Sequence, residues 1–269
     1  MNACSAGFPV PQTKPLMIYT LGRFSLVHDG QPIRYGRKAP SKPLQLLKAL
    51  IAMGGRQVGI MNLASTLWPD QDGDRARQVF ETTLHRLRKY LGDDRFLLLQ
   101  DGRLSLDPDL VWVDAWEFER CVSGLRSVIQ LPVERKACPA IHRNTERAIR
   151  LYQGHFLARD DATCWSISLQ ERLRNKFIHC LIELGHFWEQ QGMPARAIYC
   201  YQKGIEVDDL VESFYQRLMV CLEQAGRAPE ALAVYRQCRQ ILSVVLGLAP
   251  TAETQTIFGS IVARYQQTG

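Results

Sequence analysis

The residues from Asp74 to Leu91 combine an apolar stripe with side chains that could bind nucleic acid. The apolar residues have the i, i+4, i+7, i+11 spacing of one buried helix face: Phe80, Leu84, Leu87 and Leu91. The opposite face and its flanks then carry cationic, amide and hydroxyl groups: Arg75, Arg77, Gln78, Thr82, His85, Arg86, Arg88 and Lys89. Arginine and lysine pair with phosphates or with guanine, and glutamine can read adenine. The pattern predicts a DNA-reading helix, with an ordinary solvated helix face as the alternative.

The placement of charge supports a polyanion-binding surface in the same region. The whole chain has a net charge of +6. Thirteen basic and seven acidic residues lie between Arg34 and Arg103, so this stretch carries the entire excess. A local basic excess of this kind is typical of a surface that binds phosphates, although it is a weak signal alone.

The elements before the candidate helix are expected to position it. Alternating apolar residues over 17–35 predict a hairpin that turns at Asp29-Gly30 and buries Ile18, Leu26 and Ile33. Residues 41–55 predict an amphipathic helix that Ser41 could cap, that has Pro43 in its first turn and that Gly54-Gly55 ends. Its buried face would hold Leu44, Leu47 and Ile51. A shorter helix is expected from about Val58 to Pro69.

The candidate helix itself has an end signal at each side. Asp74 could cap its start and Gly92 its end. Residues 96–107 then predict a second hairpin with Asp101-Gly102 at its tip and Arg103 beside it. This order of elements is that of a winged helix-turn-helix, in which the last helix enters the major groove and the hairpin reaches the backbone or minor groove.

The second half of the chain is predicted to be entirely helical, with internal repeats. Compared with itself at an offset of 34 residues, it aligns a series of matching pairs: Leu184 with Leu218, Glu189 with Glu223, Gln190 with Gln224, Gly192 with Gly226, Ala197 with Ala231 and Tyr201 with Tyr235. This period, with a Gly turn followed by a small residue and then an aromatic one, indicates two tetratricopeptide repeats.

These residues resemble a known family. The segments LGRFSLVHDGQPI, KPLQLLKALIAMGGRQV, LASTLWPD, ARQVFETTLHRLRKYLG and the second hairpin are similar to the winged-helix domain of SARP-type activators, over about 16–119. The resemblance implies that Thr82, His85, Arg86 and Lys89 face DNA, that Trp68 packs near a phosphate and that Arg103 lies at the wing tip. It also implies that the acidic loop with Asp70, Asp72 and Asp74 meets polymerase or a neighbouring protomer. For His85 the alternative is an ordinary histidine on a solvated helix face.

A second resemblance covers about 114–267. The segment LYQGHFLARDDATCWSISLQERLRNKF is similar to the signature of the bacterial transcriptional activator domain, a tetratricopeptide-like helical array. Its matching residues are expected to be core and turn residues rather than ligand-binding ones: Tyr152, Gly154, Phe156, Leu157, Trp165, Arg172 and Leu173.

The sequence gives no sign of an enzyme, a cofactor or a metal site. It has no phosphate-gripping glycine loop, no H-E-x-x-H and no nucleophile elbow. The eight cysteines are scattered without a C-x-x-C pair, which favours small buried hydrophobes and a cytoplasmic protein. No apolar run is long enough to span a membrane.

We therefore expect an α+β winged helix-turn-helix domain over 16–113, after a flexible leader (1–15), and an all-α tetratricopeptide-like domain over 114–269. The expected function is sequence-specific activation of transcription by binding direct repeats in double-stranded DNA and contacting RNA polymerase. The partners considered include a second copy of the chain, as a homodimer on the direct repeats. Affinity would come from phosphate contacts by Lys42, Arg77 and Arg103. The alternatives are a tetratricopeptide protein-interaction module and the output fragment of a larger signalling regulator.

Overall fold

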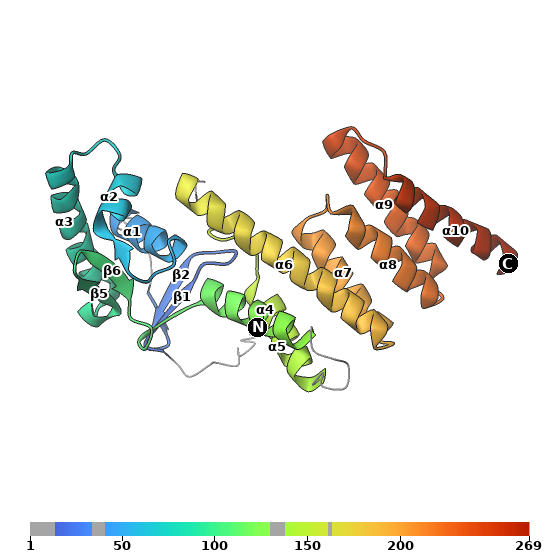
Figure 1. Cartoon of the computed structure of the whole chain (residues 1–269), viewed down its shortest axis with the longest axis horizontal. Coiled ribbons are helices and arrows are strands. Elements are labelled where there is room, and N and C mark those ends of the chain that lie inside the picture. Colours follow the sequence, from blue (N-terminus) through green and yellow to red (C-terminus); the bar gives the residue numbers. More distant parts are fainter. Residues whose placement is uncertain (1–13, 34–40, 130–137, 161–162, 269) are drawn as a thin grey trace, which may run out of the picture. The chain divides into compact units, whose positions relative to one another are not determined.

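The computed structural model describes residues 14–33, 41–129, 138–160 and 163–268 (Figure 1). These residues pack as two compact units. The N-terminal unit comprises the described residues within 1–117 and 153–171, and the repeat unit comprises those within 118–152 and 172–269. The first unit therefore takes in a segment, 153–171, that the predicted division at 113/114 assigns to the second domain.

The N-terminal unit begins with a small mixed sheet. Its strands are β1 (Leu16–Tyr19), β2 (Ser25–His28), β3 (Gln31–Pro32) and β7 (Val111–Val113), in the order β3-β2-β1-β7. β1 pairs antiparallel with β2 and parallel with β7, and Ile18 lies opposite Leu26. The leader residues Lys14 and Pro15 already bond to this region, because the Lys14 ammonium donates to the Asp109 carbonyl (2.8 Å) and the Pro15 carbonyl accepts from the Asp29 N–H (2.8 Å).

The predicted turn at Asp29-Gly30 is confirmed, between β2 and β3. Both residues have positive φ (47° and 77°), as a two-residue hairpin turn that follows the twist of its strands requires. Ile18 and Leu26 are fully buried, as expected. Ile33 is only half-buried, which corrects its assignment to the core. The physical reason is that β3 is a short edge strand whose two residues are exposed.

Three helices follow, at the predicted positions. They are α1 (Ser41–Ala52), α2 (Ile60–Leu67) and α3 (Gly73–Leu91), and α3 packs against both of the others. Leu44, Leu47 and Ile51 are buried on α1 as predicted. The start of α3 differs from the prediction, because Asp72 and not Asp74 occupies the N-cap position, without a side-chain capping bond. Asp74 lies in the first turn, where a negative charge favours the helix dipole.

The predicted end of α3 and the second hairpin are both confirmed. Gly92 adopts the left-handed conformation (φ 86°) and ends the helix. After a single 3-10 turn, Asp94–Phe96, β5 (Leu97–Gln100) and β6 (Arg103–Leu106) form the hairpin, and β4 (Val58–Gly59) joins on the other side of β6. Asp101 and Gly102 at the tip again have positive φ, 47° and 68°.

The repeat unit consists of helices, as predicted. The helices that follow β7 are α4 (Asp114–Ile129), α5 (Cys138–Leu151), α6 (Cys164–Gln190), α7 (Pro194–Val207), α8 (Glu212–Gln224), α9 (Ala228–Leu246) and α10 (Ala252–Thr268). α4 and α6 contribute residues to both units. From α7 onward each helix packs against the next one along the chain, as the antiparallel run in Figure 1 shows.

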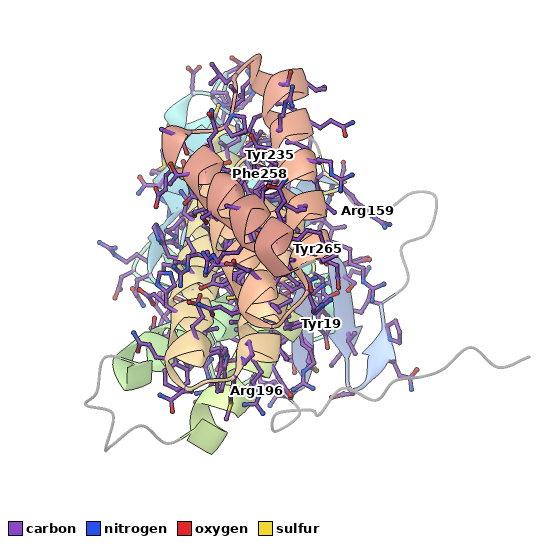
Figure 2. All side chains as sticks on the ribbon, turned by 90° about the vertical axis from the view of Figure 1, so that its right-hand side faces the viewer. Tyr19, Arg159, Arg196, Tyr235, Phe258 and Tyr265 are labelled. Carbon is purple, nitrogen blue, oxygen red and sulfur yellow. The ribbon has the colours of Figure 1, made fainter. Side chains whose placement is uncertain are left out.

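The pairs of matching residues at offset 34 have the same structural roles in the two repeats. Gly192 and Gly226 both have positive φ (65° and 73°) in the turn after the first helix of each repeat. Ala197 and Ala231 are both fully buried. The two tyrosines differ: Tyr201 is buried against Gly185, whereas Tyr235 is half-buried and stacks on Phe258 of α10 with ring centroids 3.9 Å apart (Figure 2).

The matching glutamates Glu189 and Glu223 form equivalent ion pairs in the two repeats. Glu189 on α6 pairs with Arg217 on α8, and Glu223 on α8 pairs with Arg264 on α10 (3.0 Å). Each glutamate thus binds an arginine from the next helix but one. Glu189 also accepts a hydrogen bond from the Tyr201 hydroxyl. Burial, together with this carboxylate, raises the pKa of Tyr201.

Most signature residues of the second resemblance are core or turn residues, but Arg172 is not: it is exposed on α6, and its guanidinium lies 3.6 Å from the Glu119 carboxylate. Tyr152 packs on Phe118 and Phe177, with ring centroids 5.3 and 4.4 Å away. Phe156, Leu157 and Leu173 are buried, Gly154 has φ 143° and Trp165 is half-buried. Five of the described cysteines are buried free thiols: Cys121, Cys180, Cys200, Cys221 and Cys238. Cys164 is exposed, Cys4 lies outside the described residues and the side chain of Cys138 is not described.

None of the described helices is both long enough and apolar enough to cross a membrane.

Candidate nucleic-acid interface

The polar face of α3 is free of packing. The side chains predicted to bind DNA on this helix are all exposed: Arg75, Arg77, Gln78, Thr82, His85, Arg86 and Lys89. The opposite face is buried, because Phe80, Leu84, Leu87 and Leu91 pack into the unit. The apolar stripe therefore determines which face of α3 points to solvent, and the cations follow from that orientation.

These side chains are not equally available. The Arg77 guanidinium pairs with Glu81 at 3.2 Å, and the Thr82 hydroxyl donates to the Gln78 carbonyl (3.0 Å). Arg75, Arg86 and Lys89 form no ion pair with any residue in the described ranges. Within the described part of the chain, these three cations are therefore unneutralised.

Arg88, which the sequence places on the flank of this face, has a structural role instead. It is half-buried, and its guanidinium donates to the Leu97 carbonyl (2.8 Å) at the start of β5. This bond holds the end of α3 to the second hairpin, so Arg88 is not part of the exposed set.

The remaining predicted residues lie on three other elements of the same unit. Lys42 is exposed in the first turn of α1. Trp68 is half-buried at the end of α2, where its backbone N–H donates to the Ala64 carbonyl (2.8 Å). The loop after it exposes Asp70 and Asp72, and Asp74 is exposed just inside α3.

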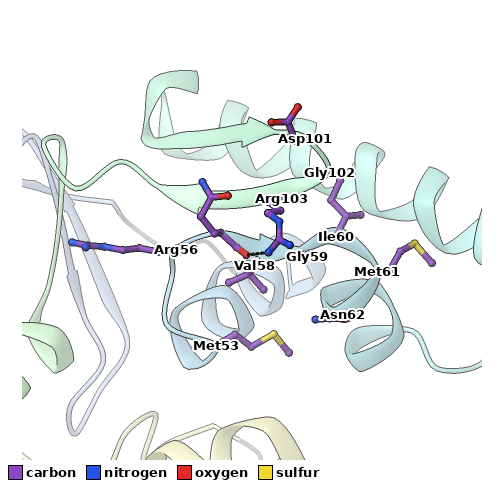
Figure 3. A pocket seen from close by; sticks show the side chains of 11 residues that line it. Met53, Arg56, Val58, Gly59, Ile60, Met61, Asn62, Asp101, Gly102 and Arg103 are labelled. Atoms are coloured by element: carbon purple, nitrogen blue, oxygen red, sulfur yellow. Dashed lines mark hydrogen bonds between the residues drawn. The ribbon is translucent and has the colours of Figure 1, made fainter.

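Arg103 lies beside the hairpin tip and lines a pocket of about 710 Å³ (Figure 3). Its guanidinium donates to the Gln57 carbonyl (3.1 Å), and Gln57 has a positive φ of 52°. The hairpin tip is also joined to α2, because the Ile60 N–H donates to the Gly102 carbonyl (3.0 Å). The β5–β6 hairpin and the N-terminal end of α2 therefore meet at this pocket, and the partial positive charge of that helix end favours anions.

Arg56 and Asn62, which were not among the predicted residues, line the same pocket. The Arg56 side chain extends away from the other labelled residues (Figure 3). Its place directly after Gly54-Gly55 was the available signal, since a cation in a turn that ends a helix is exposed. Asn62 has no comparable signal, because only the β4–β6 pairing places it near Arg103.

Among the described residues, no group of three or more His, Cys, Asp or Glu side chains is placed to hold a metal ion. The exposed face offers hydrogen-bond donors and positive charge, which are the groups that bind phosphates and base edges.

The fold is a small α+β unit followed by helical repeats, and comparison with known proteins identifies the family. The bacterial transcriptional activator domain model matches residues 113–262, and the chain belongs to this family. The chain is 28% identical over 247 residues to the transcriptional regulator RedD of Streptomyces coelicolor, covering 88% of this chain and 67% of RedD. It is 26% identical over 257 residues to the regulatory protein AfsR of the same organism, covering 93% of this chain and 25% of AfsR. The chain thus spans only a quarter of the length of AfsR.

A solved structure shares the fold. The structure of EmbR from Mycobacterium tuberculosis, in complex with a low-affinity phosphopeptide, matches 94% of this chain and 66% of EmbR. The TM-score is 0.68 and the sequence identity is 20%. Together these comparisons confirm the SARP-type resemblance drawn from the sequence.

Proposed function

We propose that the N-terminal unit is a winged helix-turn-helix that binds duplex DNA, with α3 in the major groove and the β5–β6 hairpin as the wing. The observation that carries the proposal is the exposed face of α3, where Arg75, Arg86 and Lys89 are unpaired among the described residues. Leaving three cations unneutralised on one helix face is unfavourable for the free protein, and phosphates remove that repulsion.

The proposed DNA-binding residues fall into two groups, those that contact base edges and those that contact phosphates. Gln78, Thr82 and Arg86 lie along the exposed face and are proposed to read base edges, with His85 beside them. The proposed phosphate contacts come from the ends of several elements: Lys42, Trp68, Arg75, Arg77, Lys89 and Arg103, with Arg56 added from the structure. Phosphate contacts would supply affinity and fix the register, and base contacts would supply specificity.

We further propose that the chain activates transcription at direct repeats, one copy to each repeat, and contacts RNA polymerase. RedD is a transcriptional regulator by name and AfsR is a regulatory protein by name, and both names support a role in transcription. The acidic loop with Asp70 and Asp72 is exposed beside α3 and suits a contact with a basic protein surface.

The deciding experiment is a salt titration of the full chain on duplex DNA, followed by selection of bound sequences from random duplexes. DNA binding through several phosphates predicts a linear fall of log K with log salt, with a slope of about −0.9 for each phosphate neutralised. Replacing Lys89 with Ala should lower the magnitude of that slope by roughly one phosphate equivalent. Lys203→Ala on the repeat unit, where Lys203 pairs with Glu206 at 2.5 Å, is the control and should leave the slope unchanged.

The alternative is a protein-interaction module in which the repeat unit binds a partner and α3 binds no DNA. That alternative predicts no binding to duplex DNA even at low salt, which would refute the proposed function.

A further inference from the structure

The segment 153–160 packs into the N-terminal unit as a series of bends and turns that pairs with Thr20–Gly22. Leu21 and Phe156 form an antiparallel bridge. The Gly22 N–H donates to the His155 carbonyl (2.9 Å), and the Leu157 N–H donates to the Thr20 carbonyl (2.8 Å). Phe156 and Leu157 are 0% and 2% exposed, so this contact is part of the core of the unit.

Two glycines let the two backbones touch. Gly22 has φ +84°, and a Cβ on it would lie 2.6 Å from the Gln153 carbonyl oxygen. Gly154 has φ +143°, and a Cβ there would lie 3.1 Å from the Gly22 Cα. Neither position has room for a side chain, so this close approach depends on glycine on both sides.

Side chains fix the segment at Asp160 and also fix the loop at Thr20–Gly22 against which the segment lies. The Lys48 ammonium on α1 pairs with Asp160 at 2.5 Å and lies over the Phe24 ring, 4.4 Å from its centroid. The buried Asp114 carboxylate accepts the N–H groups of Thr20 and Leu21 (2.8 and 2.9 Å), which fixes the loop that receives the segment. Lys48 thus connects the segment to α1, the helix against which α3 packs.

The segment is also held by the repeat unit through the chain itself. The chain passes between the units at 117/118, at 152/153 and at 171/172. Residues 153–171 are therefore connected to the repeat unit at both ends, while their first half is bound into the N-terminal unit. We propose that docking of 153–160 onto Thr20–Gly22 and Lys48 maintains the DNA-binding form of the N-terminal unit, so that the repeat unit regulates DNA affinity through this segment.

This proposal rests on the proposed DNA binding and makes Lys48 and Asp160 positioning residues. The Lys48 side chain is only 14% exposed and is already paired, so it is not available to a phosphate. Its effect on DNA must pass through α1. By reciprocity, DNA bound at α3 then stabilises the docked segment to the same extent as docking favours DNA.

The test measures DNA affinity of full-length Asp160→Asn at fixed salt, well below its melting temperature. The substitution removes a negative charge, so simple electrostatics predicts an equal or higher affinity for DNA. The proposal predicts the opposite, a loss of about fivefold or more, which is the usual size of coupling between sites. Glu230→Gln is the matched control: it makes the same charge change in the exposed Arg227–Glu230 pair of the repeat unit, and it should cause no loss.

A second measurement separates positioning from simple stabilisation. Amide hydrogen exchange of the full chain, with and without saturating duplex DNA, should show slower exchange at Gly22 and Leu157, whose N–H groups bond across the junction. If α3 becomes protected but these two amides do not, or if Asp160→Asn lowers only the melting temperature, the coupling is refuted while DNA binding stands. If DNA neither binds nor protects α3, the proposed function fails and the coupling fails with it.

Discussion

At the scale of single residues, the cations of α3 differ in whether they already have an ionic partner that a contact with DNA would disturb. Arg86 is exposed and has no ion pair among the described residues, whereas Arg77 already pairs with Glu81 at 3.2 Å. Both side chains of that pair are more than half exposed, so the pair itself contributes little to stability. A phosphate bound by Arg77 nevertheless lies close to the Glu81 carboxylate, and this repulsion reduces the gain.

We therefore expect Arg86→Ala to weaken binding to the selected operator by about 1–3 kcal/mol and to relax specificity at one base pair. Arg77→Ala should cost less than about 1 kcal/mol and should weaken operator and random duplex DNA equally. Dissociation constants on both duplexes at one salt concentration provide the measurement. A loss from Arg86→Ala that is equal on both duplexes would show that Arg86 contacts phosphate and not a base.

Asp114 is the residue whose removal should harm the N-terminal unit most. It is 2% exposed, and its carboxylate accepts the N–H groups of Thr20, Leu21 and Ala115 and the Thr20 hydroxyl (2.6 Å). Burial raises the pKa of Asp114 to about 6, and these hydrogen bonds act against that rise. The role of Asp114 follows from these four donors, because each of them points at one of its carboxylate oxygens.

Replacing Asp114 with Ala leaves those four donors without their acceptor. Because a buried unsatisfied donor costs about 1–3 kcal/mol, we expect the free energy of unfolding of the N-terminal unit to fall by at least about 3 kcal/mol. Urea denaturation followed by intrinsic tryptophan fluorescence, to which Trp68, Trp112 and Trp116 of the N-terminal unit contribute, would report it. Asp109→Ala is the control, since the Asp109 side chain is 94% exposed, and it should change stability by less than about 0.5 kcal/mol.

At the scale of elements, the packing of the repeat helices overrides helix propensity. Gly204 lies inside α7, where glycine is unfavourable by about 1 kcal/mol relative to alanine. A Cβ at this position would lie 2.3 Å from the Phe214 ring on α8. The glycine therefore allows α7 and α8 to approach, at the expense of intrinsic helix stability.

We expect Gly204→Ala to destabilise the repeat unit by about 1–3 kcal/mol, because overpacking outweighs the gain in propensity. Gly259→Ala in α10 is the matched control: a Cβ there meets nothing within 4 Å, so the same substitution should stabilise the protein by up to about 1 kcal/mol. Thermal denaturation of the two variants provides the comparison. Stabilisation by both would mean that Phe214 moves aside without loss.

At the scale of the whole molecule, the N-terminal unit is not a continuous stretch of sequence. A fragment that ends at residue 113, the predicted domain boundary, lacks both Asp114 and the segment 153–171. It loses the acceptor for the Thr20 and Leu21 N–H groups and the buried side chains of Phe156 and Leu157.

We expect the fragment 14–113 to melt at least about 10 °C below the first transition of the full chain, since several kcal/mol are lost and 1 kcal/mol shifts a domain of this size by about 4–8 °C. Circular dichroism melting curves of the fragment and the full chain provide the measurement. Equal melting temperatures would show that 14–113 is an independent domain and that the inserted segment contributes no stability.

The sequence alone determined the local features of this protein. Paired residues such as Asp29-Gly30 and Asp101-Gly102 adopt the positive φ that their hairpins require, because few other residues tolerate that conformation. The apolar spacing in α3 predicted which residues are exposed, because a helix with one buried stripe has one orientation. The offset of 34 residues predicted the Gly turns and the small residues between repeat helices.

Only the tertiary structure decided the features that depend on distant residues. Arg88 looks like the other cations of α3, but its bond to the Leu97 carbonyl removes it from the exposed set. The pocket with Arg56, Asn62 and Arg103 depends on the pairing of β4 with β6, in which Val58 lies opposite Leu104, 46 residues further along the chain. The return of 153–160 to the N-terminal unit depends on contact between two glycines, Gly22 and Gly154, and their spacing in the sequence carries no periodic signal. Local conformational preference is encoded residue by residue, whereas such contacts arise only when the whole chain has packed.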